Sequence, residues 1–191
     1  MNIFEAYLKK YQQFIILILG LPCSNKSELA KELIIDLNIP KININNYLWP
    51  NTFIEKKIQD ITFKLYEHPD NYNWNKLNHD VNEIKKNGIV LYGNYINLSK
   101  IDFNIDFIYF INLNNNFCKT LLIEKKLLPY EGDDEKVKLY FSDIFNPIYD
   151  ELKASLKINK FFNIKETTTF DEIYDDMFNN LIDLIYKKIS E

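Results

Sequence analysis

The stretch FIILILGLPCSNKSELAKEL, from Phe14 to Leu33, decides the fold of this chain. It begins with six apolar residues, Phe14 to Leu19, which predict a buried strand. A short turn follows at Gly20, and beyond Lys26 the apolar residues recur at helical spacing. These residues are Leu29, Ala30, Leu33, Ile34 and Leu37. The stretch therefore predicts a strand, a tight loop and a helix that packs on the strand.

The loop between that strand and helix has nearly the spacing of a phosphate-binding loop. The template G-x-x-x-x-G-K-[ST] corresponds here to Gly20, four residues, Asn25, Lys26 and Ser27. Backbone N–H groups of such a loop, and the N-terminus of the helix after it, point at phosphates. Asn25 replaces the second glycine, and asparagine is a non-glycine residue that tolerates a left-handed backbone. The replacement is therefore compatible with the loop.

Each residue of this loop has an expected task toward ATP and Mg²⁺. Lys26 would reach the β- and γ-phosphates, and Ser27 would give its hydroxyl to Mg²⁺. Backbone groups from Gly20 to Asn25, with Cys23 and Ser24 among them, would surround the phosphates. An ordinary strand–loop–helix with a chance Lys-Ser pair is the alternative, and the order of the elements favours phosphate binding.

Composition narrows the class of protein. The chain has 191 residues and a net charge of −4 without a basic stripe, which argues against binding a nucleic-acid polymer. It has no long apolar run and no signal-peptide pattern, so we expect a cytoplasmic protein with no membrane partner. Cys23 and Cys118 have no metal-ligand spacing. All 23 basic residues are lysine, so no guanidinium can clamp a phosphate in bidentate geometry.

Short apolar segments alternate with helical patterns along the rest of the chain. Further strands are expected at 39–45, 89–92, 107–112 and 161–164. Helices are expected near the N-terminus with Phe4, Tyr7, Leu8 and Tyr11 inward, at 52–66, 74–86, 114–128 and 135–156 with a bend or restart at Pro147, and after a Thr169–Glu172 capping box. This order predicts an α/β three-layer sandwich with a five-stranded parallel sheet and helices on both faces. The length suits one domain over 1–191.

The segment from Leu65 to Ile96 resembles the uridine kinase and nicotinamide riboside kinase group of P-loop nucleoside kinases. Tyr66-Glu67-His68-Pro69-Asp70 matches the group's aromatic, acid, x-Pro-acid motif, and the strand that ends at Tyr92-Gly93 matches one that ends in Glu-Gly. A later stretch from Tyr140 to Tyr149 resembles the helix that follows the lid. The resemblance covers about Phe14 to Glu172 in the same order. It implies one P-loop kinase-like domain over 1–191, with a small lid at about 127–136.

This resemblance implies a kinase that transfers the γ-phosphoryl of ATP–Mg²⁺ to the 5′-hydroxyl of a ribonucleoside such as uridine, cytidine or nicotinamide riboside. Tyr66 would flank the base, and Glu67 would hold the ribose hydroxyls. Lys125 and Lys126 occupy the positions of lid arginines. The resemblance thus assigns catalytic roles to Lys26, Asn45, Glu67 and Lys125, substrate binding to Asn46, Tyr66, Glu67 and Lys126, and the metal to Ser27.

Asn45 and Asn46 stand where the group has an aspartate that accepts the hydroxyl proton and helps to hold Mg²⁺. An amide cannot act as a general base, and Tyr92 replaces the glutamate of the third strand. Glu67 or Asp70 could take over the base's role. These departures favour a second hypothesis, a catalytically impaired nucleotide-binding pseudokinase.

A third hypothesis is a kinase for a nucleotide or another small hydroxyl compound. The aromatic residues from Tyr66 to Trp74 favour a small-molecule nucleoside partner instead. No pattern in the sequence specifies an oligomer.

Overall fold

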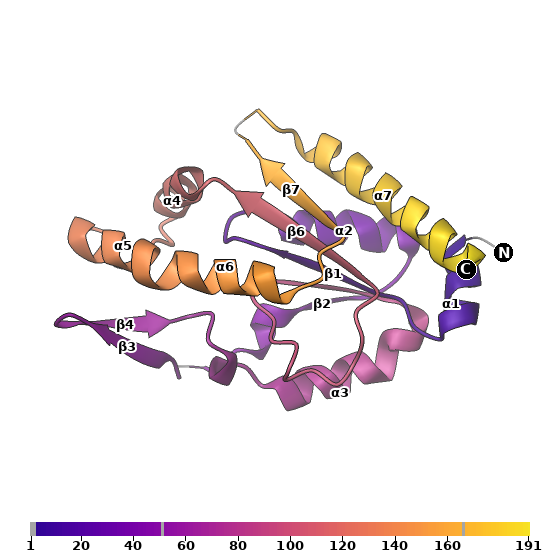
Figure 1. The fold of residues 1–191 in the computed structure, drawn as a ribbon, viewed down its shortest axis with the longest axis horizontal. Coiled ribbons are helices and arrows are strands. Elements are labelled where there is room, and N and C mark those ends of the chain that lie inside the picture. Colours follow the sequence, from indigo (N-terminus) through magenta and orange to yellow (C-terminus); the bar gives the residue numbers. More distant parts are fainter. Residues whose placement is uncertain (1–2, 51, 166) are drawn as a thin grey trace.

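Five parallel strands form the centre of the molecule, in the order β2-β5-β1-β6-β7 (Figure 1). The computed structural model describes residues 3–50, 52–165 and 167–191. The strands are β1 Ile15–Gly20, β2 Lys41–Asn43, β5 Ile89–Gly93, β6 Phe107–Leu113 and β7 Lys160–Ile164. All five strands expected from the sequence are confirmed, although β2 is shorter than the expected 39–45.

Strand β1 is the middle of this sheet, and every one of its residues is buried. It pairs with β5 on one side, where Leu19 lies opposite Gly93, and with β6 on the other, where Gly20 lies opposite Ile111. A strand covered on both faces needs apolar side chains at every position, which explains its continuous apolar run.

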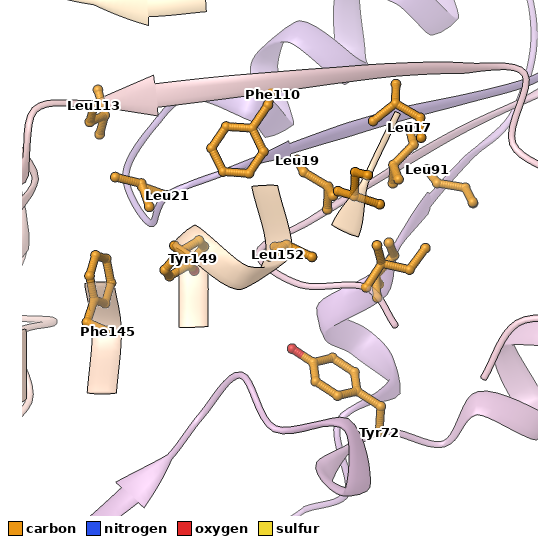
Figure 2. Close-up of a cluster of buried hydrophobic side chains, with 14 of the residues drawn as sticks. Leu17, Leu19, Leu21, Tyr72, Leu91, Phe110, Leu113, Phe145, Tyr149 and Leu152 are labelled. Carbon is orange, nitrogen blue, oxygen red and sulfur yellow. The ribbon is translucent and has the colours of Figure 1, made fainter. Parts of the chain in front are cut away.

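Helices cover both faces of the sheet, as the alternation of side chains along β1 requires. Ile16 and Ile18 contact the core beneath α1 Ile3–Tyr11, α2 Lys26–Leu37 and α7 Phe170–Ser190. Leu17 and Leu19 belong to the opposite core, which is closed by α3 Trp74–Ile84, α4 Asn115–Glu124, α5 Asp134–Tyr140 and α6 Asn146–Ser155. Figure 2 shows part of this second core, with Tyr149 and Leu152 of α6 lying beneath the sheet.

The helix expected at 52–66 is wrong. This segment forms an antiparallel hairpin of β3 Ile54–Ile58 and β4 Ile61–Leu65. Its apolar residues fit a helical period, but Phe63 is buried while its neighbours Thr62 and Lys64 are exposed, which is the period of a strand. The two-residue turn places Gln59 in the left-handed region, at φ 54°, without the glycine that normally announces such a turn.

The helix expected at 135–156 is two helices joined by a π-helical turn at Phe141–Phe145. The Asn146 N–H donates to the Phe141 carbonyl across this turn, and the next residue, Pro147, has no N–H to donate. The restart expected near Pro147 is thus confirmed, and π turns of this kind occur often at functional sites.

The capping box expected at Thr169 and Glu172 starts α7. Two other helices end earlier than expected. Helix α3 ends at Ile84, and a 3-10 turn at Lys85–Asn87 separates it from Gly88, which has φ 82°. Helix α4 ends at Glu124, four residues before the expected end. The inward position expected for Tyr11 is wrong: this residue of α1 is 38% exposed, and its hydroxyl donates to the Lys188 carbonyl at 2.6 Å.

No helix in the described part of the chain is long and apolar enough to cross a membrane.

We predict that Gly20→Ala lowers the free energy of unfolding by about 3 kcal/mol. A Cβ atom at Gly20 would lie 2.6 Å from the Ile111 carbonyl oxygen, and that oxygen belongs to the neighbouring strand and cannot turn away. The matched control is Gly132→Ala, whose Cβ would meet nothing within 4 Å. Its positive φ of 89° alone predicts a loss of about 1 kcal/mol. Urea unfolding midpoints measure both, and equal losses would contradict the prediction.

Candidate active site

The segment from Gly20 to Ser27 joins β1 to α2 at the edge where all five strands have their carboxyl ends. The Leu21 N–H donates to the Ile111 carbonyl at 3.3 Å, and the Ser24 N–H donates back to the Leu21 carbonyl at 3.3 Å. Asn25 has φ 56° and ψ 19°. The left-handed backbone expected at this asparagine is therefore confirmed.

Two features leave hydrogen-bonding groups of this loop open. Asn25 precedes α2, but its side chain makes no capping hydrogen bond, so it supplies no acceptor to the N–H groups of the first turn. The Ser24 hydroxyl is buried and has no hydrogen-bond partner among the described residues. Buried polar groups normally have partners, and helix N-termini attract anions. A phosphate bound at this position would accept hydrogen bonds from the Ser24 hydroxyl and from the N–H groups of the first turn.

Lys26 begins α2 with only 8% of its surface exposed. Its Nζ donates to the Leu21 carbonyl at 3.0 Å, and it forms no ion pair within the described ranges. Burial lowers the pKa of Lys26 to about 8, although the thiol of Cys23 and the carboxyl of Glu67 act in the opposite direction. A buried cation in this state gains strongly from an anionic ligand.

Glu67 approaches the same space from the end of the hairpin, two residues after β4. Its carboxyl is buried, and burial raises its pKa to about 7. The Tyr149 hydroxyl donates to its Oε1 at 3.3 Å, the Asn94 side chain also hydrogen-bonds to it, and Lys26 attracts its charge. These contacts hold the carboxyl in place, but they do not offset the loss of water.

Asn45 lies in a 3-10 turn, Ile44–Tyr47, just beyond β2. Its Oδ1 accepts a hydrogen bond from the Asn94 N–H at 3.2 Å, while Asn46 is exposed. Asn94 follows β5 and therefore connects Asn45, through its backbone, to Glu67, through its side chain. Sequence reasoning missed Asn94, although its position directly after the Gly93 strand end was a usable signal.

A cavity of about 600 Å³ opens beside Glu67. One wall is the segment after β5, from Tyr95 to Ser99, and a second is one face of α6 and the preceding π turn. The third wall includes Glu67, His68 and Pro69. Glu67 is therefore both a wall of the cavity and a neighbour of Lys26. The volume is typical of small-molecule sites.

Tyr66 and Tyr92, two aromatic residues singled out from the sequence, lie outside the wall of this cavity. Tyr66 is half-buried, with its ring edge-on to Phe53 at 5.1 Å. Tyr92 packs on the opposite face of the sheet, where the Lys41 ammonium lies 5.8 Å from its ring centre. Tyr95 lines the cavity instead, and it belongs to no motif in the sequence.

Lys125 and Lys126 are exposed at the end of α4. The charge of Lys125 is close enough to contribute to the lowered pKa of Lys26. Helix α4 also touches the loop directly, because the Cys118 Sγ donates to the Pro22 carbonyl at 3.6 Å. The end of α4 therefore lies on the same side of the molecule as the loop (Figure 1).

A second cavity, of about 480 Å³, adjoins α4. Asn116, Phe117 and Thr120 of α4 form one side of it, and the other side includes Ile164 at the end of β7, Lys165 and Thr167. The cavity and the contact with the loop thus lie on the same helix, because Phe117 of the lining directly precedes Cys118, which donates to the Pro22 carbonyl.

The segment expected to form a lid is fastened to the hairpin. The Tyr130 hydroxyl accepts a hydrogen bond from the Lys64 N–H at 2.9 Å, and its ring lies edge-on to Phe63 at 5.1 Å. One tyrosine therefore connects the segment after α4 to strand β4.

Groups that could hold a metal are sparse. Among the described residues no three His, Cys, Asp or Glu side chains lie close enough to bind a metal ion together. Ser27 is exposed on the first turn of α2, beside the open N–H groups. Mg²⁺ commonly keeps several waters and takes one or two protein groups together with phosphate oxygens. This set of donors fits Mg²⁺ that arrives with a nucleotide.

No protein-family profile and no curated protein matches the sequence. Among solved structures, the chain is similar to a shikimate kinase from Bacteroides thetaiotaomicron, with a TM-score of 0.50 and 13% identity over 90% of this chain and 99% of that chain. It is also similar to the YorR protein from Bacillus subtilis in complex with phosphorylated GDP, with a TM-score of 0.49, 15% identity and coverage of 91% and 98%. A gluconokinase from Sinorhizobium meliloti 1021 matches with a TM-score of 0.48, 12% identity and coverage of 92% and 95%. The first of these likenesses shows the fold alone: this α/β sandwich has the architecture of that shikimate kinase.

We predict that the Glu67→Gln variant becomes more stable relative to the wild type as the pH rises. Between its ordinary pKa of 4.5 and the raised pKa of about 7, the folded chain keeps a proton at Glu67 that the unfolded chain has released. The stability from this group is therefore complete below pH 4.5 and is lost as the pH rises through 7. The difference between these two pKa values corresponds to a change of roughly 3 kcal/mol in the free energy of unfolding.

The free energies of unfolding of the wild type and Glu67→Gln should thus diverge from pH 4.5 to pH 8, as measured by urea titration. Glu124→Gln, which changes an exposed carboxylate of α4, should show no such divergence. A constant difference between the wild type and Glu67→Gln across this range would contradict the prediction.

Proposed function

We propose that this chain is an ATP-dependent phosphotransferase that transfers the γ-phosphoryl to the 5′-hydroxyl of a ribonucleoside, such as uridine, cytidine or nicotinamide riboside. The observation that carries the proposal is the position of Glu67, a buried carboxyl that lines the 600 Å³ cavity and interacts electrostatically with Lys26. A hydroxyl compound in the cavity can therefore meet the carboxyl on one side and a phosphate held at Lys26 on the other.

The donor nucleotide is assigned to the loop and the second cavity. ATP, when bound, supplies the phosphoryl group, and Mg²⁺ arrives with it. The open N–H groups and Ser24 hydroxyl bind phosphate oxygens, and Lys26 contributes its positive charge. Ser27 offers its hydroxyl to the metal. The cavity beside Phe117 is the space for the donor base, because α4 contacts the loop through Cys118.

Lys125 adds a second positive charge near the phosphates of the donor. Its charge is close enough to Lys26 to lower the pKa of that lysine. Lys126 follows it at the end of α4, and we assign it the same role. Arginines have this role in the kinases that the sequence resembles. Both are point charges without the bidentate geometry of arginine.

The acceptor is assigned to the larger cavity, with Glu67 as the group that takes the hydroxyl proton. A general base works best when its pKa lies near the working pH, and the pKa of Glu67 is raised to about 7. Tyr149 and Asn94 orient the carboxyl. Asn45 and Asn46 can only donate or accept hydrogen bonds at this place. Phosphoryl transfer depends mostly on positioning and charge, so one base of this kind is sufficient.

The proposal also covers the domain, its lid and its location in the cell. We assign residues 1–191 to a single P-loop kinase domain in the cytoplasm, with the lid at about 127–136 and a nucleoside as the small-molecule partner. The contact of Tyr130 with the hairpin supports a lid that moves together with the acceptor side.

A catalytically impaired nucleotide-binding pseudokinase is the second candidate. It is favoured by Asn45, whose amide replaces a carboxylate at the end of β2 and whose oxygen is already occupied by the Asn94 N–H. This candidate keeps the loop and its ATP but transfers nothing. The third hypothesis, a kinase for a nucleotide or another hydroxyl compound, differs only in the acceptor.

We predict ADP release from ATP–Mg²⁺ that requires a nucleoside and disappears in Lys26→Ala. Lys26 is the buried cation at the loop, so its removal should lower the rate to background. Lys31→Ala is the matched control, because this lysine is exposed on the same helix and should leave the rate unchanged. A coupled ADP assay with a nucleoside panel measures the rates. Binding of ATP without nucleoside-dependent turnover would instead establish the pseudokinase.

We predict that Glu67→Gln lowers kcat by about 10²–10⁴-fold, the usual contribution of a positioned base. In the wild type, kcat/KM should rise with pH through about 7 as the Glu67 carboxyl ionises, and the variant should lose this rise. Asn45→Asp provides the comparison: it should raise the rate only modestly if Glu67 is already the base. A large gain from Asn45→Asp, together with a small loss from Glu67→Gln, would contradict the assignment.

A further inference from the structure

We propose that Cys23 and Cys118 form a reversible disulfide bond on exposure to hydrogen peroxide, and that this bond lowers the affinity of the loop from Gly20 to Ser27 for its phosphate ligand. This modification lies beyond the proposed function, because it concerns two sulfur atoms that take no part in phosphoryl transfer. Three features of the molecule support it: the contact between the two residues, the backbone at Cys23 and the surroundings of the exposed sulfur.

The two cysteines of the chain meet although they lie far apart in the sequence. The Cys118 Sγ donates to the Pro22 carbonyl at 3.6 Å, a contact that spans 96 positions. That carbonyl is joined by a peptide bond to the nitrogen of Cys23, so the sulfur of Cys118 lies against the backbone of its partner. Burial raises the pKa of the Cys118 thiol, and the nearby thiol of Cys23 raises it further. Both thiols are free. A bond between them therefore requires a local adjustment of the loop and no rearrangement of the fold.

The backbone at Cys23 has a conformation that favours glycine. Its φ is 65°, in the left-handed region, where a Cβ atom is strained. Glycine would relieve this strain, because it has no Cβ atom. Strained residues persist where the surrounding structure holds them, and they cluster at functional sites and switch regions. The chain thus carries a thiol here at a local cost, which a role for the sulfur explains.

Cys23 is the thiol that an oxidant meets first. Its side chain is partly exposed, whereas that of Cys118 is fully buried. Helix α2 begins shortly after it, at Lys26, and its thiol is close enough to oppose the burial that lowers the pKa of that lysine. Reactive cysteines lie in such partly exposed, electropositive surroundings. Burial raises the pKa of Cys118 to about 12, so this thiol does not start the reaction.

The reaction has two steps, with hydrogen peroxide as the oxidant. The sulfur of Cys23 attacks one peroxide oxygen, the O–O bond breaks, and a sulfenic acid and one water form. The sulfur of Cys118 then attacks the sulfur of Cys23, the S–O bond breaks, and the hydroxyl leaves with the Cys118 proton as a second water. The two thiols lose two electrons in total, and the peroxide gains them. Two molecules of a thiol such as glutathione reverse the bond by exchange.

The bond acts on the turn that positions Lys26. Cys23 lies within a turn in which the Ser24 N–H donates to the Leu21 carbonyl at 3.3 Å. The same carbonyl accepts a hydrogen bond from the Lys26 Nζ at 3.0 Å. A bond that draws Cys23 toward α4 pulls on this turn and displaces the N–H groups and the ammonium that would hold a phosphate. Oxidation therefore weakens the binding of ATP.

Peptide mass spectrometry of the full chain without reductant, after treatment with hydrogen peroxide, tests the bond itself. We expect a linked pair of peptides that contain Cys23 and Cys118, and we expect dithiothreitol to separate them. In Cys118→Ala the sulfenic acid at Cys23 has no partner, so dimedone should label it severalfold more than in the wild type. Absence of the linked pair, or equal dimedone labelling of the two proteins, would overturn the proposal.

Calorimetric titration with ATP–Mg²⁺ measures the consequence for the loop. The affinity of the wild type should fall about tenfold or more on oxidation and should return with dithiothreitol. Cys23→Ser cannot form the bond, so its affinity should be the same before and after peroxide, which also controls for oxidation elsewhere in the chain. A wild type that forms the linked pair but binds ATP equally well in both states would overturn the effect on the loop.

Formation of the bond needs no nucleotide, so a failure of this inference differs from a failure of the proposed function. The linked pair in a chain that binds no ATP would uphold the disulfide and contradict both the kinase and the effect on ATP. Binding of ATP by a chain that never forms the linked pair would overturn the inference and leave the kinase standing.

Discussion

The burial of two oppositely charged groups, Lys26 and Glu67, in one small space is the constraint on which the site depends. The pKa of Lys26 is lowered to about 8 and that of Glu67 is raised to about 7, both because water is excluded. Neither group forms an ion pair within the described ranges, and the hydrogen bonds that each group makes do not offset the loss of water. Lys26 is therefore suited to bind an anion, and Glu67 is suited to take up and release a proton near neutral pH.

The fold creates this constraint through the central strand. Strand β1 is buried along its whole length, and its last residue, Gly20, lies so close to Ile111 that no side chain fits. The loop therefore begins deep in the sheet and brings Lys26 inward. On the other side, α6 packs against the sheet through Tyr149 and Leu152 (Figure 2). The Tyr149 hydroxyl donates to the Glu67 carboxyl at 3.3 Å.

Local patterns in the sequence were sufficient to predict the five strands, the loop, the left-handed Asn25 and the capping box of α7, because each is set by neighbouring residues. The hairpin was missed because its apolar residues fit both a helical and a strand period, and only the burial of Phe63 by the tertiary fold decides between them. Contacts such as Tyr149 with Glu67, which join residues 82 apart, have no local signal. The roles expected for Glu67 and Lys26 were named from motifs, whereas Asn94 and Tyr95 emerged only from the structure.

Tyr130 connects two parts of the chain that are far apart in the sequence, the β3–β4 hairpin and the segment after α4. The Lys64 N–H donates to its hydroxyl and its ring packs edge-on to Phe63, so this one tyrosine joins strand β4 to the segment after α4. A change in the length of the hairpin would displace this tyrosine and shift the segment after α4 as well. Exchange of the hairpin between related proteins, in evolution or in the laboratory, would therefore have to carry its tyrosine partner along.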